Sequence, residues 1–205
     1  MVIVDLKVTA GFFVANVQYL YLTEFAVKDL FEGGVKMFRP MRRKNQELSQ
    51  ELTDKLLQTG TAGVLAVAGD DGYPYAVPIS YAYDKENQRF LFHSAKEGHK
   101  IDAFLREPKV SFCVIDKATT VAKEYTSYFR SAIAFGRMSE ITGDDRVPAM
   151  MVIGKKYCSE YVDGMQEYIE KALNRIRLWE LKIEHLTGKE SIELVQMRQK
   201  GENVD

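Results

Sequence analysis

The first regular pattern along the chain is a helical one. Its apolar positions are Leu48, Leu52, Leu56 and Leu57. The first three recur four positions apart and Leu57 adjoins Leu56, as one face of an α-helix requires. Ser49 precedes the helix and can cap its first turn, and Gly60 follows it, where glycine commonly ends a helix. The pattern therefore predicts a short helix between Ser49 and Gly60.

Short apolar or alternating runs then predict six strands. They occupy residues 61–68, 73–83, 89–94, 109–116, 126–142 and 177–188. The sequence GDDG separates the first two runs and predicts a hairpin. Pro74 and Pro78 cannot donate hydrogen bonds to a neighbouring strand, so the second strand is expected at a sheet edge or at a bulge. Gly136 is expected to bend the fifth strand.

Few helices interrupt these strands. Ile101, Phe104 and Leu105 form an apolar helix face that stops before Pro108. Residues 144–174 predict two helices with a break at 162–164. Their expected inward positions are Val147, Met150, Met151, Tyr157, Tyr168, Ile169 and Leu173. Strands joined by tight turns and accompanied by short helices predict an α+β domain dominated by β, an antiparallel barrel with flanking helices.

Length and composition fit one domain. The chain has 205 residues, 46% of them hydrophobic, and 28 basic side chains nearly balance 29 acidic ones. No long-range field then favours nucleic acid or an anionic membrane surface, and neither is expected as a partner. Residues 37–191 are expected to form the domain, and residues 192–205 are a polar tail expected to fray.

Residues 1–36 match nothing downstream and are treated as an extension of unknown role. The uncharged run at 8–23 is shorter than the ~20 residues of a membrane span. Asp5 and Lys7 leave no positive region typical of a secretory signal. One hypothesis is that Met37 is the true start of the protein. The two cysteines, Cys113 and Cys158, form no C-x-x-C motif, and we expect buried, unreactive thiols in a reduced, cytoplasmic protein.

Several familiar enzyme motifs are absent from the sequence. It contains no G-x-S-x-G, no G-x-x-x-x-G-K-[ST], no H-E-x-x-H and no G-x-G-x-x-G. These absences argue against α/β-hydrolases, P-loop enzymes, zincins and dinucleotide-binding domains of the Rossmann type.

Two of the three histidines lie in residues 92–100, FHSAKEGHK, at a predicted strand-to-helix junction. The Ser94 hydroxyl, the amides near Gly98 and the side chains of His99 and Lys100 could converge on a phosphate group. A solvated loop is the alternative. The strand YAVPISYAY, with its two prolines and its hydroxyls, suits a flat aromatic ligand, although an ordinary edge strand has the same features.

Taken together, these segments resemble a known family. The segments are VPISYAYD, RFLFHSAKEGHKIDAFLREPKVSFCV, YFRSAIAFGRMSEI and LKIEHLTGKES. They are similar, in order and spacing, to the flavin-binding split-barrel proteins related to pyridoxamine 5'-phosphate oxidase, and most similar to the nitroimidazole-resistance (Nim-type) branch. The resemblance covers residues 37–191.

The resemblance implies a six-stranded split barrel and a homodimer with two FMN sites at the subunit interface. The cofactor-binding positions that it implies are Val77, Pro78, Ile79, Ser80, Tyr81, His93, Ser94, His99, Lys100, Tyr128, Arg130 and Trp179. The strand at 77–81 would contact the flavin ring, and His99 and Lys100 would hold the phosphate. Residues 128–131 would approach from the partner strand, and Trp179 would help to close the site from the other subunit. No metal site is implied.

The implied activity is that of an FMN-dependent oxidoreductase, a reductase acting on a small aromatic acceptor. NADH or NADPH is compatible as electron donor. Oxidase members of the family end in an Arg-x-x-Pro substrate segment, whereas this chain ends in QKGENVD, which argues against pyridoxamine phosphate oxidation. The alternative is a non-catalytic flavin-binding or storage protein, or a heme-binding relative.

His93 has two interpretations. It is either a proton donor or orienting group beside the reduced flavin, since imidazole titrates near neutral pH, or a strand-end histidine bonded to backbone. His185, in the last predicted strand, is expected to point outward and to be structural.

Overall fold

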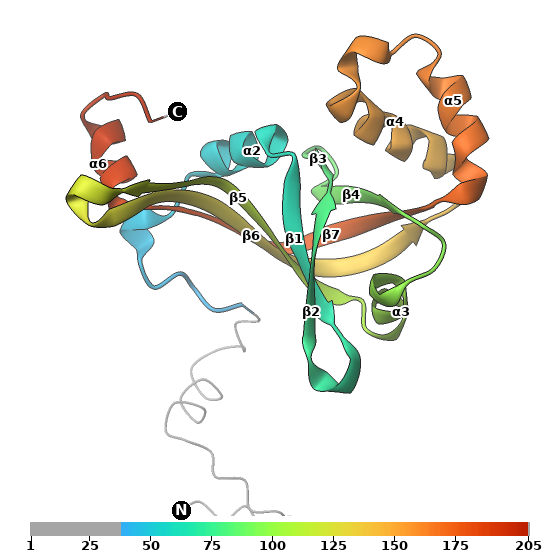
Figure 1. The fold of residues 1–205 in the computed structure, drawn as a ribbon, viewed down its shortest axis with the longest axis horizontal. Coiled ribbons are helices and arrows are strands. Elements are labelled where there is room, and N and C mark those ends of the chain that lie inside the picture. Colours follow the sequence, from blue (N-terminus) through green and yellow to red (C-terminus); the bar gives the residue numbers. More distant parts are fainter. Residues whose placement is uncertain (1–37, 205) are drawn as a thin grey trace, which may run out of the picture. The chain divides into compact units, whose positions relative to one another are not determined.

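The computed structural model describes residues 38–204, and seven strands form one antiparallel sheet there (Figure 1). The strands are β1 (Ala62–Ala68), β2 (Pro74–Ser80), β3 (Ala82–Asp84), β4 (Arg89–Ser94), β5 (Lys109–Val121), β6 (Thr126–Ile141) and β7 (Arg177–Glu190). Their order in the sheet is β2-β1-β5-β6-β7-β4-β3. All of them belong to the unit Pro40–Asp205. The expectations for residues 1–36 and Met37 lie outside the described residues.

The sheet has seven strands and not six because Tyr81 divides the predicted strand 73–83. β2 pairs with β1, whereas β3 pairs with β4. Between them, the backbone N–H of Tyr81 donates to the Tyr157 hydroxyl at 2.9 Å, and the carbonyl of Tyr81 accepts from the same hydroxyl at 2.7 Å. A side chain thus satisfies the backbone at the point where the chain changes partner strands.

The predictions for β2 and for Gly136 are confirmed. β2 pairs only with β1 and is an edge strand, as its prolines require. The register between β6 and β7 shifts between Phe135 and Gly136, which marks a bulge. A Cβ atom on Gly136 would lie 2.0 Å from the carbonyl oxygen of Lys182, so only glycine permits this approach of the two strands.

Five α-helices lie in the described residues 38–204. They are α2 (Gln50–Thr59), α3 (His99–Arg106), α4 (Arg146–Tyr157), α5 (Met165–Ala172) and α6 (Ile192–Gln199). Single 3₁₀ turns occupy Lys44–Gln46, Asp70–Gly72, Ala122–Glu124, Gly143–Asp145, Ser159–Tyr161 and Leu173–Arg175. The predicted helix caps of α2 are correct, because the Ser49 side chain accepts a hydrogen bond from the Leu52 amide and Gly60 is the residue after the helix.

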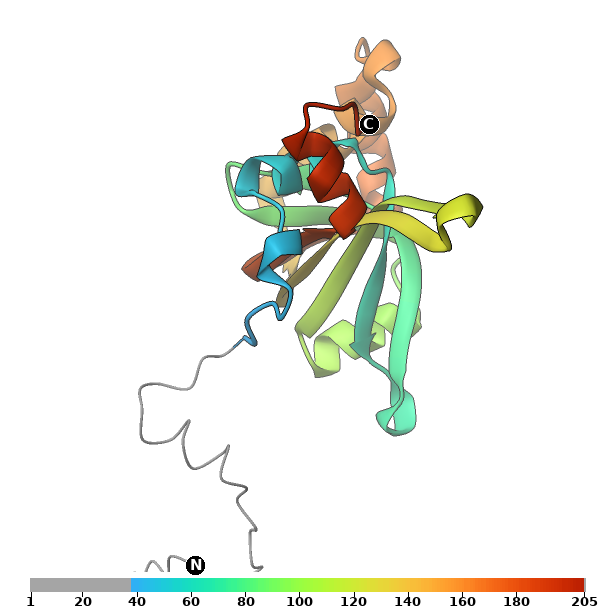
Figure 2. The same cartoon turned by 90° about the vertical axis from the view of Figure 1, so that its left-hand side faces the viewer.

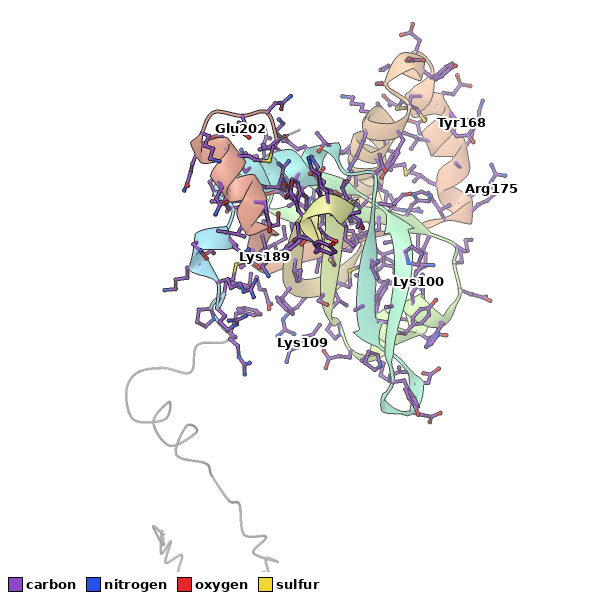
Figure 3. The ribbon with its side chains drawn as sticks, turned by 60° about the vertical axis from the view of Figure 1, so that its left-hand side comes forward. Lys100, Lys109, Tyr168, Arg175, Lys189 and Glu202 are labelled. Atoms are coloured by element: carbon purple, nitrogen blue, oxygen red, sulfur yellow. The ribbon has the colours of Figure 1, made fainter. Side chains whose placement is uncertain are left out.

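Two expectations about burial in the helical insertion between β6 and β7 are wrong. Tyr157 and Tyr168 are exposed, Tyr168 by 72%, and Figure 3 shows Tyr168 on the outer side of α5. The buried side chains of α4 and α5 are Ala149, Ile153, Met165 and Ile169. Small and aliphatic side chains permit close packing of α4 on the sheet.

The C-terminal tail and both cysteines also differ from expectation. Residues 192–199 form α6, whose Leu194 and Val195 are buried, so this part of the tail does not fray. Figure 2 shows α6 beside the 3₁₀ turn Lys44–Gln46 at the start of the domain. Cys158 is exposed and Cys113 is half-buried; both thiols are free.

The core consists of two apolar clusters on opposite sides of β4. Phe90 and Phe92 belong to the larger cluster, together with Tyr81 and Phe112, beneath α2 and α3. Leu91, the residue between the two phenylalanines, belongs to the smaller cluster, which packs against α4. Because both faces of β4 are covered, the end of this strand and the chain that follows it are held firmly in place.

Candidate functional site

The junction between β4 and α3 has the strand, loop and helix order expected of FHSAKEGHK. Gly98 precedes the helix with φ 138°, which only glycine adopts without strain, and its carbonyl accepts from the amides of Ile101 and Asp102. A Cβ atom on Gly98 would meet nothing within 4 Å. The first amides of the helix have no intrahelical acceptor, and the backbone beside them is open to an approaching ligand.

Contacts of His99 and Arg106 fasten α3 to the β1–β2 hairpin. The His99 ring stacks on Tyr75 of β2, with 4.1 Å between ring centroids, and its Nε2 lies 3.4 Å from an oxygen of Asp70. Arg106 pairs with the other oxygen of Asp70 at 3.1 Å and donates to two carbonyls of the hairpin. The start of α3 is thereby held beside the edge strand β2.

His93 and Lys100 lie near each other across this junction. His93 is the last outward side chain of β4, and Lys100 belongs to the first turn of α3. Partial desolvation and the charge of Lys100 both lower the pKa of His93 below its ordinary value. At neutral pH the imidazole is therefore uncharged and can both donate and accept a hydrogen bond. Among the described residues, no carboxylate pairs with Lys100.

Ser94 and Trp179 hold the end of β4 in place from the core side. The Trp179 indole N–H donates to the Ser94 hydroxyl at 3.0 Å, and that hydroxyl donates to the Ala95 carbonyl at 2.8 Å. Trp179 is only 2% exposed and packs on Phe104 of α3. The expectation that Trp179 approaches from another subunit is at odds with this position, because its ring is part of its own chain's core.

The side chains of residues 77–81 point in two directions. Pro78 and Ser80 are exposed, whereas Val77 and Ile79 turn toward the larger apolar cluster. The side chain of Tyr81 is fully buried, and its hydroxyl donates to the Leu57 carbonyl at 2.8 Å. The exposed face of β2 thus offers Pro78, Ser80 and the backbone of its free edge.

Tyr128 and Arg130 lie far from this junction within the chain. His93 pairs with Leu178 at the start of β7, whereas Arg130 pairs with Glu190 at its end. The distance along an extended strand between these two partners is about 40 Å. Figure 3 labels Lys100 and Lys189, the neighbour of Glu190, on different parts of the domain.

Both side chains have partners at that far end. Arg130 pairs with Asp116 at 3.3 Å and donates to the Val204 carbonyl at 3.1 Å. The Tyr128 hydroxyl donates to Glu124 at 2.7 Å. One chain therefore brings together His93, Ser94, His99, Lys100 and β2, but neither Tyr128 nor Arg130.

The outward face of the sheet carries an apolar surface. Residues that pair across β2, β1, β5, β6 and β7 share this face. They form two rows, Pro78, Val64, Cys113, Ile133 and Thr187, and Ala76, Ala66, Ser111, Phe135 and His185. Val64, Ile133 and Phe135 are 38 to 40% exposed. His185 stacks on Phe135 and lies on the outward face, as predicted. We call these ten residues the outer face.

Two residues near β2 escaped the sequence analysis. The Lys156 ammonium donates to the Gly60 carbonyl at 2.5 Å and lies 3.8 Å from the ring centroid of Tyr81. Burial lowers the pKa of Lys156 to about 8. Tyr157, its neighbour, supplies the hydroxyl that bonds the Tyr81 backbone and the Thr61 carbonyl. No local signal identifies either residue, because their hydrogen bonds join residues 76 or 96 positions apart.

Two classes of site find no support in residues 38–204. No helix of this part of the chain is long and apolar enough to cross a membrane. Nor does it contain a group of three or more His, Cys, Asp or Glu side chains arranged to hold a metal ion.

Comparisons with known proteins agree with this architecture. The model of the pyridoxamine 5'-phosphate oxidase family matches residues 49–190, more than half of the chain. A search of curated proteins found no significant match.

Several solved structures share the fold. One, from Bacteroides thetaiotaomicron, is a candidate 5-nitroimidazole antibiotic resistance protein, with 20% identity, a TM-score of 0.59 and coverage of 70% of this chain and 86% of that one. A conserved hypothetical protein from Mycobacterium tuberculosis has 16% identity, a TM-score of 0.62 and coverage of 73% and 90%. An FAD and heme binding protein from Mycobacterium smegmatis has 20% identity, a TM-score of 0.60 and coverage of 72% and 73%.

The match to the family spans β1 through β7, and the shared fold confirms the α+β split barrel with flanking helices that the sequence predicts, with one more strand than expected. The chain belongs to the flavin-binding split-barrel family related to pyridoxamine 5'-phosphate oxidase.

Proposed function

We propose that the protein binds FMN at the junction of β2, β4 and α3 and acts as a flavin-dependent oxidoreductase. The observation that carries the proposal is the position of Lys100, which has no carboxylate partner among the described residues, in the first turn of a helix preceded by an open glycine. A charged ammonium and free helix amides together suit a phosphate monoester. Bound flavin would supply the two-electron chemistry.

The residues of the junction would divide the work of binding. Lys100 would contribute charge, and Gly98 would permit close approach of the phosphate to the backbone. The exposed Ser80 and the free backbone edge at Pro78 and Ile79 would bond the polar edge of the flavin ring. Because His99 already lies beside Asp70, we assign it a supporting role in phosphate binding. Lys100 would supply most of the positive charge that meets the phosphate.

His93 would orient the ligand as a neutral group. The lowered pKa of this histidine keeps a lone pair on one ring nitrogen and a proton on the other at neutral pH. Its place at the end of β4, above the Ser94 and Trp179 hydrogen bond, limits its movement. Proton transfer to or from a reduced flavin is the catalytic role that we assign to it.

A homodimer would complete the site. The outer face exposes Val64, Ile133 and Phe135, an apolar surface of the kind that marks protein interfaces. Tyr128 and Arg130 lie too far from Lys100 to share a ligand within one chain. Two chains that pair through the outer face could bring the 128–131 segment of one chain to the β2 strand of the other.

The substrate that we propose is a small aromatic acceptor such as a nitroaromatic compound, with NADH or NADPH as donor. Support comes from the fold shared with the Bacteroides protein described above and from the sequence resemblance to the Nim-type branch.

Heme binding is the second candidate, and one observation favours it. His185 lies on the apolar outer face, stacked on Phe135, where an axial ligand for a flat apolar group could stand. The FAD and heme binding protein from Mycobacterium smegmatis shares this fold. A Soret band in the purified protein would support heme and argue against the flavin proposal.

The test begins with the absorption spectrum of the purified protein and an FMN titration followed by quenching of flavin fluorescence. Lys100→Ala is expected to weaken FMN binding about 10- to 150-fold, the equivalent of a charge-assisted hydrogen bond of about 1.5–3 kcal/mol. Lys123→Ala, an exposed lysine of the β5–β6 connection, is the matched control. Equal FMN affinity in both variants would show that the phosphate lies elsewhere.

A turnover assay separates an enzyme from a storage protein. Oxidation of NADPH with a nitroaromatic acceptor should exceed that of an equal concentration of free FMN. Rates no higher than with free FMN would favour flavin storage.

A further inference from the structure

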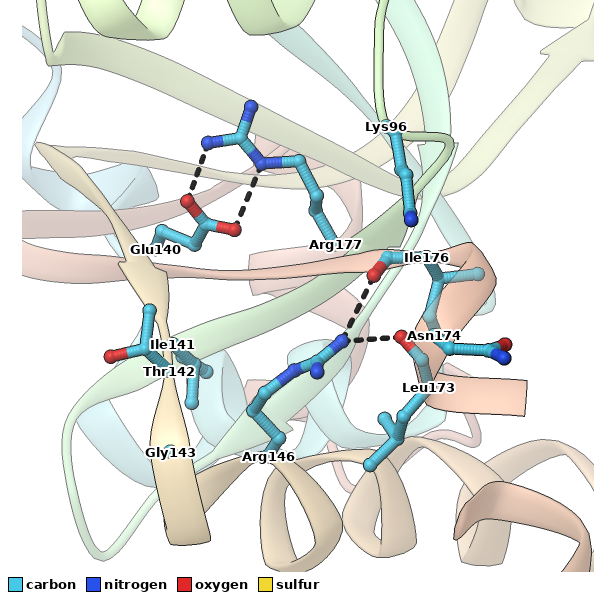
Figure 4. A pocket seen from close by; sticks show the side chains of 10 residues that line it. All are labelled: Lys96, Glu140, Ile141, Thr142, Gly143, Arg146, Leu173, Asn174, Ile176 and Arg177. Atoms are coloured by element: carbon cyan, nitrogen blue, oxygen red, sulfur yellow. Dashed lines mark hydrogen bonds and ion pairs between the residues drawn. The ribbon is translucent and has the colours of Figure 1, made fainter. Parts of the chain in front are cut away.

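A pocket with a volume of about 480 Å³ opens where β6 ends and β7 begins, outside the junction assigned to flavin. Its walls come from the loop after β4, the end of β6, the start of α4 and the 3₁₀ turn before β7 (Figure 4). Its charged lining residues are Lys96, Glu140, Arg146 and Arg177. A pocket of this size is large enough for a small metabolite.

Arg177 and Glu140 form a rigid wall of the pocket. The guanidinium of Arg177 donates from Nε to one Glu140 oxygen at 2.8 Å and from Nη2 to the other. It also lies over the Trp179 ring, with 4.7 Å from its central carbon to the ring centroid. This two-point bond lowers the pKa of Glu140, so the carboxylate stays charged and offsets Arg177.

Arg146 is positioned by backbone and not by a carboxylate. Its Nη2 atom donates to the carbonyls of Leu173 at 2.5 Å and Ile176 at 3.0 Å, as Figure 4 shows. Carbonyl oxygens orient a guanidinium but do not neutralise it. The charge of Arg146 also contributes to the lowered pKa of Glu140, which places the two groups in one electrostatic environment.

Lys96 adds a third cation from the segment FHSAKEGHK, in which the flavin proposal gives it no role. Its side chain extends toward Ile176 and Asn174 in Figure 4. In residues 38–204 no carboxylate pairs with it. The pocket therefore holds three cations and one carboxylate, an excess of positive charge in a protein with a formal net charge of -1.

From this arrangement we propose that the pocket is a second ligand site, which binds the oxyanion of a small molecule, a phosphate or a carboxylate, between Lys96 and Arg146. The Thr142 hydroxyl and the Asn174 side-chain amide, both in the lining, supply further hydrogen bonds. The site does not depend on the proposed flavin function, because that proposal gives no role to Lys96, Arg146, Thr142 or Asn174. The loop 95–98 lies between the two sites, with Lys96 directed to one and Lys100 to the other.

Amide NMR spectra of the full-length protein test the proposal with two probes, inorganic phosphate and benzoate. Saturable shifts are expected at the amides of Lys96, Thr142 and Gly143, with at least one of the two probes. The probe that binds identifies the class of anion. The amides of Gly98, His99 and Lys100 report on the flavin junction. Anion binding at that junction is therefore detected separately from binding at the pocket.

Lys96→Met is expected to weaken the binding seen at the pocket amides at least tenfold, and Lys123→Met is the matched control. Both lysines are exposed to solvent, so neither change should affect folding. Shifts confined to residues 98–100, shifts that rise linearly without saturation, or equal binding by the Lys96→Met variant would each overturn the proposal. If the protein does not bind FMN but its pocket amides still shift with the probes, the proposed second site is supported. Only the flavin proposal is then contradicted.

Discussion

Partial desolvation and the charge of Lys100 both lower the pKa of His93, so a side chain in the first turn of α3 acts on the last outward side chain of β4. The two residues come from opposite sides of a loop whose glycine has a positive φ. This coupling joins Lys100, the phosphate-binding side chain of the proposed flavin site, to His93, the titratable side chain near the end of β4.

Lys100→Ala is accordingly expected to raise the pKa of His93. The positive charge disfavours the imidazolium, and its removal leaves only partial desolvation to hold the pKa below the ordinary 6.5. Titration of the His93 C2–H resonance by NMR measures the change, with His93→Gln identifying the resonance among the three histidines. Lys96→Ala is the control, since it alters a lysine of the loop before α3; an equal rise in both variants would contradict the specific coupling.

Bound FMN is expected to raise the pKa of His93, as the Lys100→Ala change does. A phosphate dianion at Lys100 offsets the ammonium charge, so the pKa of His93 is expected to rise when FMN is added to the wild-type protein. In the Lys100→Ala variant at saturating FMN the rise should be at least as large, since no cation then opposes the dianion. An unchanged His93 pKa on saturation would place the phosphate away from Lys100.

Tyr157→Phe is expected to destabilise the fold by about 1–3 kcal/mol. The hydroxyl bonds the amide and the carbonyl of Tyr81 and the carbonyl of Thr61, at the point where the chain passes from β2 to β3. Its removal leaves a backbone donor in a crowded region without its partner. Urea unfolding measures the loss, and Tyr161→Phe, an exposed tyrosine of the same insertion, should cost nothing measurable. Equal stability of the two variants would show that water replaces the lost hydroxyl.

Lys156 makes the stability depend on pH above neutrality. Its pKa is about 8 in the folded protein, against an ordinary value of 10.5. Below pH 8 both folded and unfolded chains carry the proton, and the folded chain bears the cost of a half-buried charge. Between pH 8 and 10.5 only the unfolded chain binds the proton, so the free energy of unfolding rises with pH through this window.

The expected rise is about 1–2 kcal/mol, after allowance for solvent screening of a half-buried group. It is measured as the difference in urea unfolding between the wild-type protein and Lys156→Met, which removes the titration and keeps the length of the side chain. Lys155→Met alters an exposed neighbour and should follow the wild-type curve. A difference between wild type and Lys156→Met that stays constant from pH 7 to 10.5 would disprove the lowered pKa.

The sequence predicts most elements of this fold because their patterns are local. The helix between Ser49 and Gly60 and the edge strand with Pro74 and Pro78 each follow from residues within a few positions of one another. The division of the strand 73–83 at Tyr81 does not, because it depends on a hydroxyl from Tyr157. Local propensity carries no information on such a distant partner.

The candidate site was predictable to a similar extent. Segment FHSAKEGHK contains its own turn glycine and charges, and the structure places Lys100 and His93 together as a strand-to-helix junction requires. The Asp70 partner of His99 comes from a separate hairpin. The burial of Trp179 could not be predicted from the local pattern, because the side chains that contact it, Phe104 and Ser94, lie more than 70 positions away in the sequence.

The outer face makes the proposed dimer testable with one substitution. Ile133 lies in the middle of its row, between Cys113 and Thr187, and is 40% exposed in the chain described here. In a dimer that buries this face, Ile133→Arg would place an unpaired charge in an apolar interface, at a cost of several kcal/mol. We therefore expect the wild-type protein to sediment as a dimer and Ile133→Arg as a folded monomer.

Cys113 reports on the same face without any change to it. In a Cys158→Ser background it is the remaining thiol, and its labelling by a disulfide reagent should be at least tenfold faster in the Ile133→Arg monomer than in the dimer. Tyr168→Arg adds the same charge at a 72% exposed position on α5 and should leave both sedimentation and labelling unchanged. A wild-type protein that sediments as a monomer, or a dimer that survives Ile133→Arg with Cys113 still protected, would rule out pairing through the outer face. Because the proposal takes Tyr128 and Arg130 from the partner chain, FMN binding should weaken in the Ile133→Arg monomer even though Lys100 and His93 are intact.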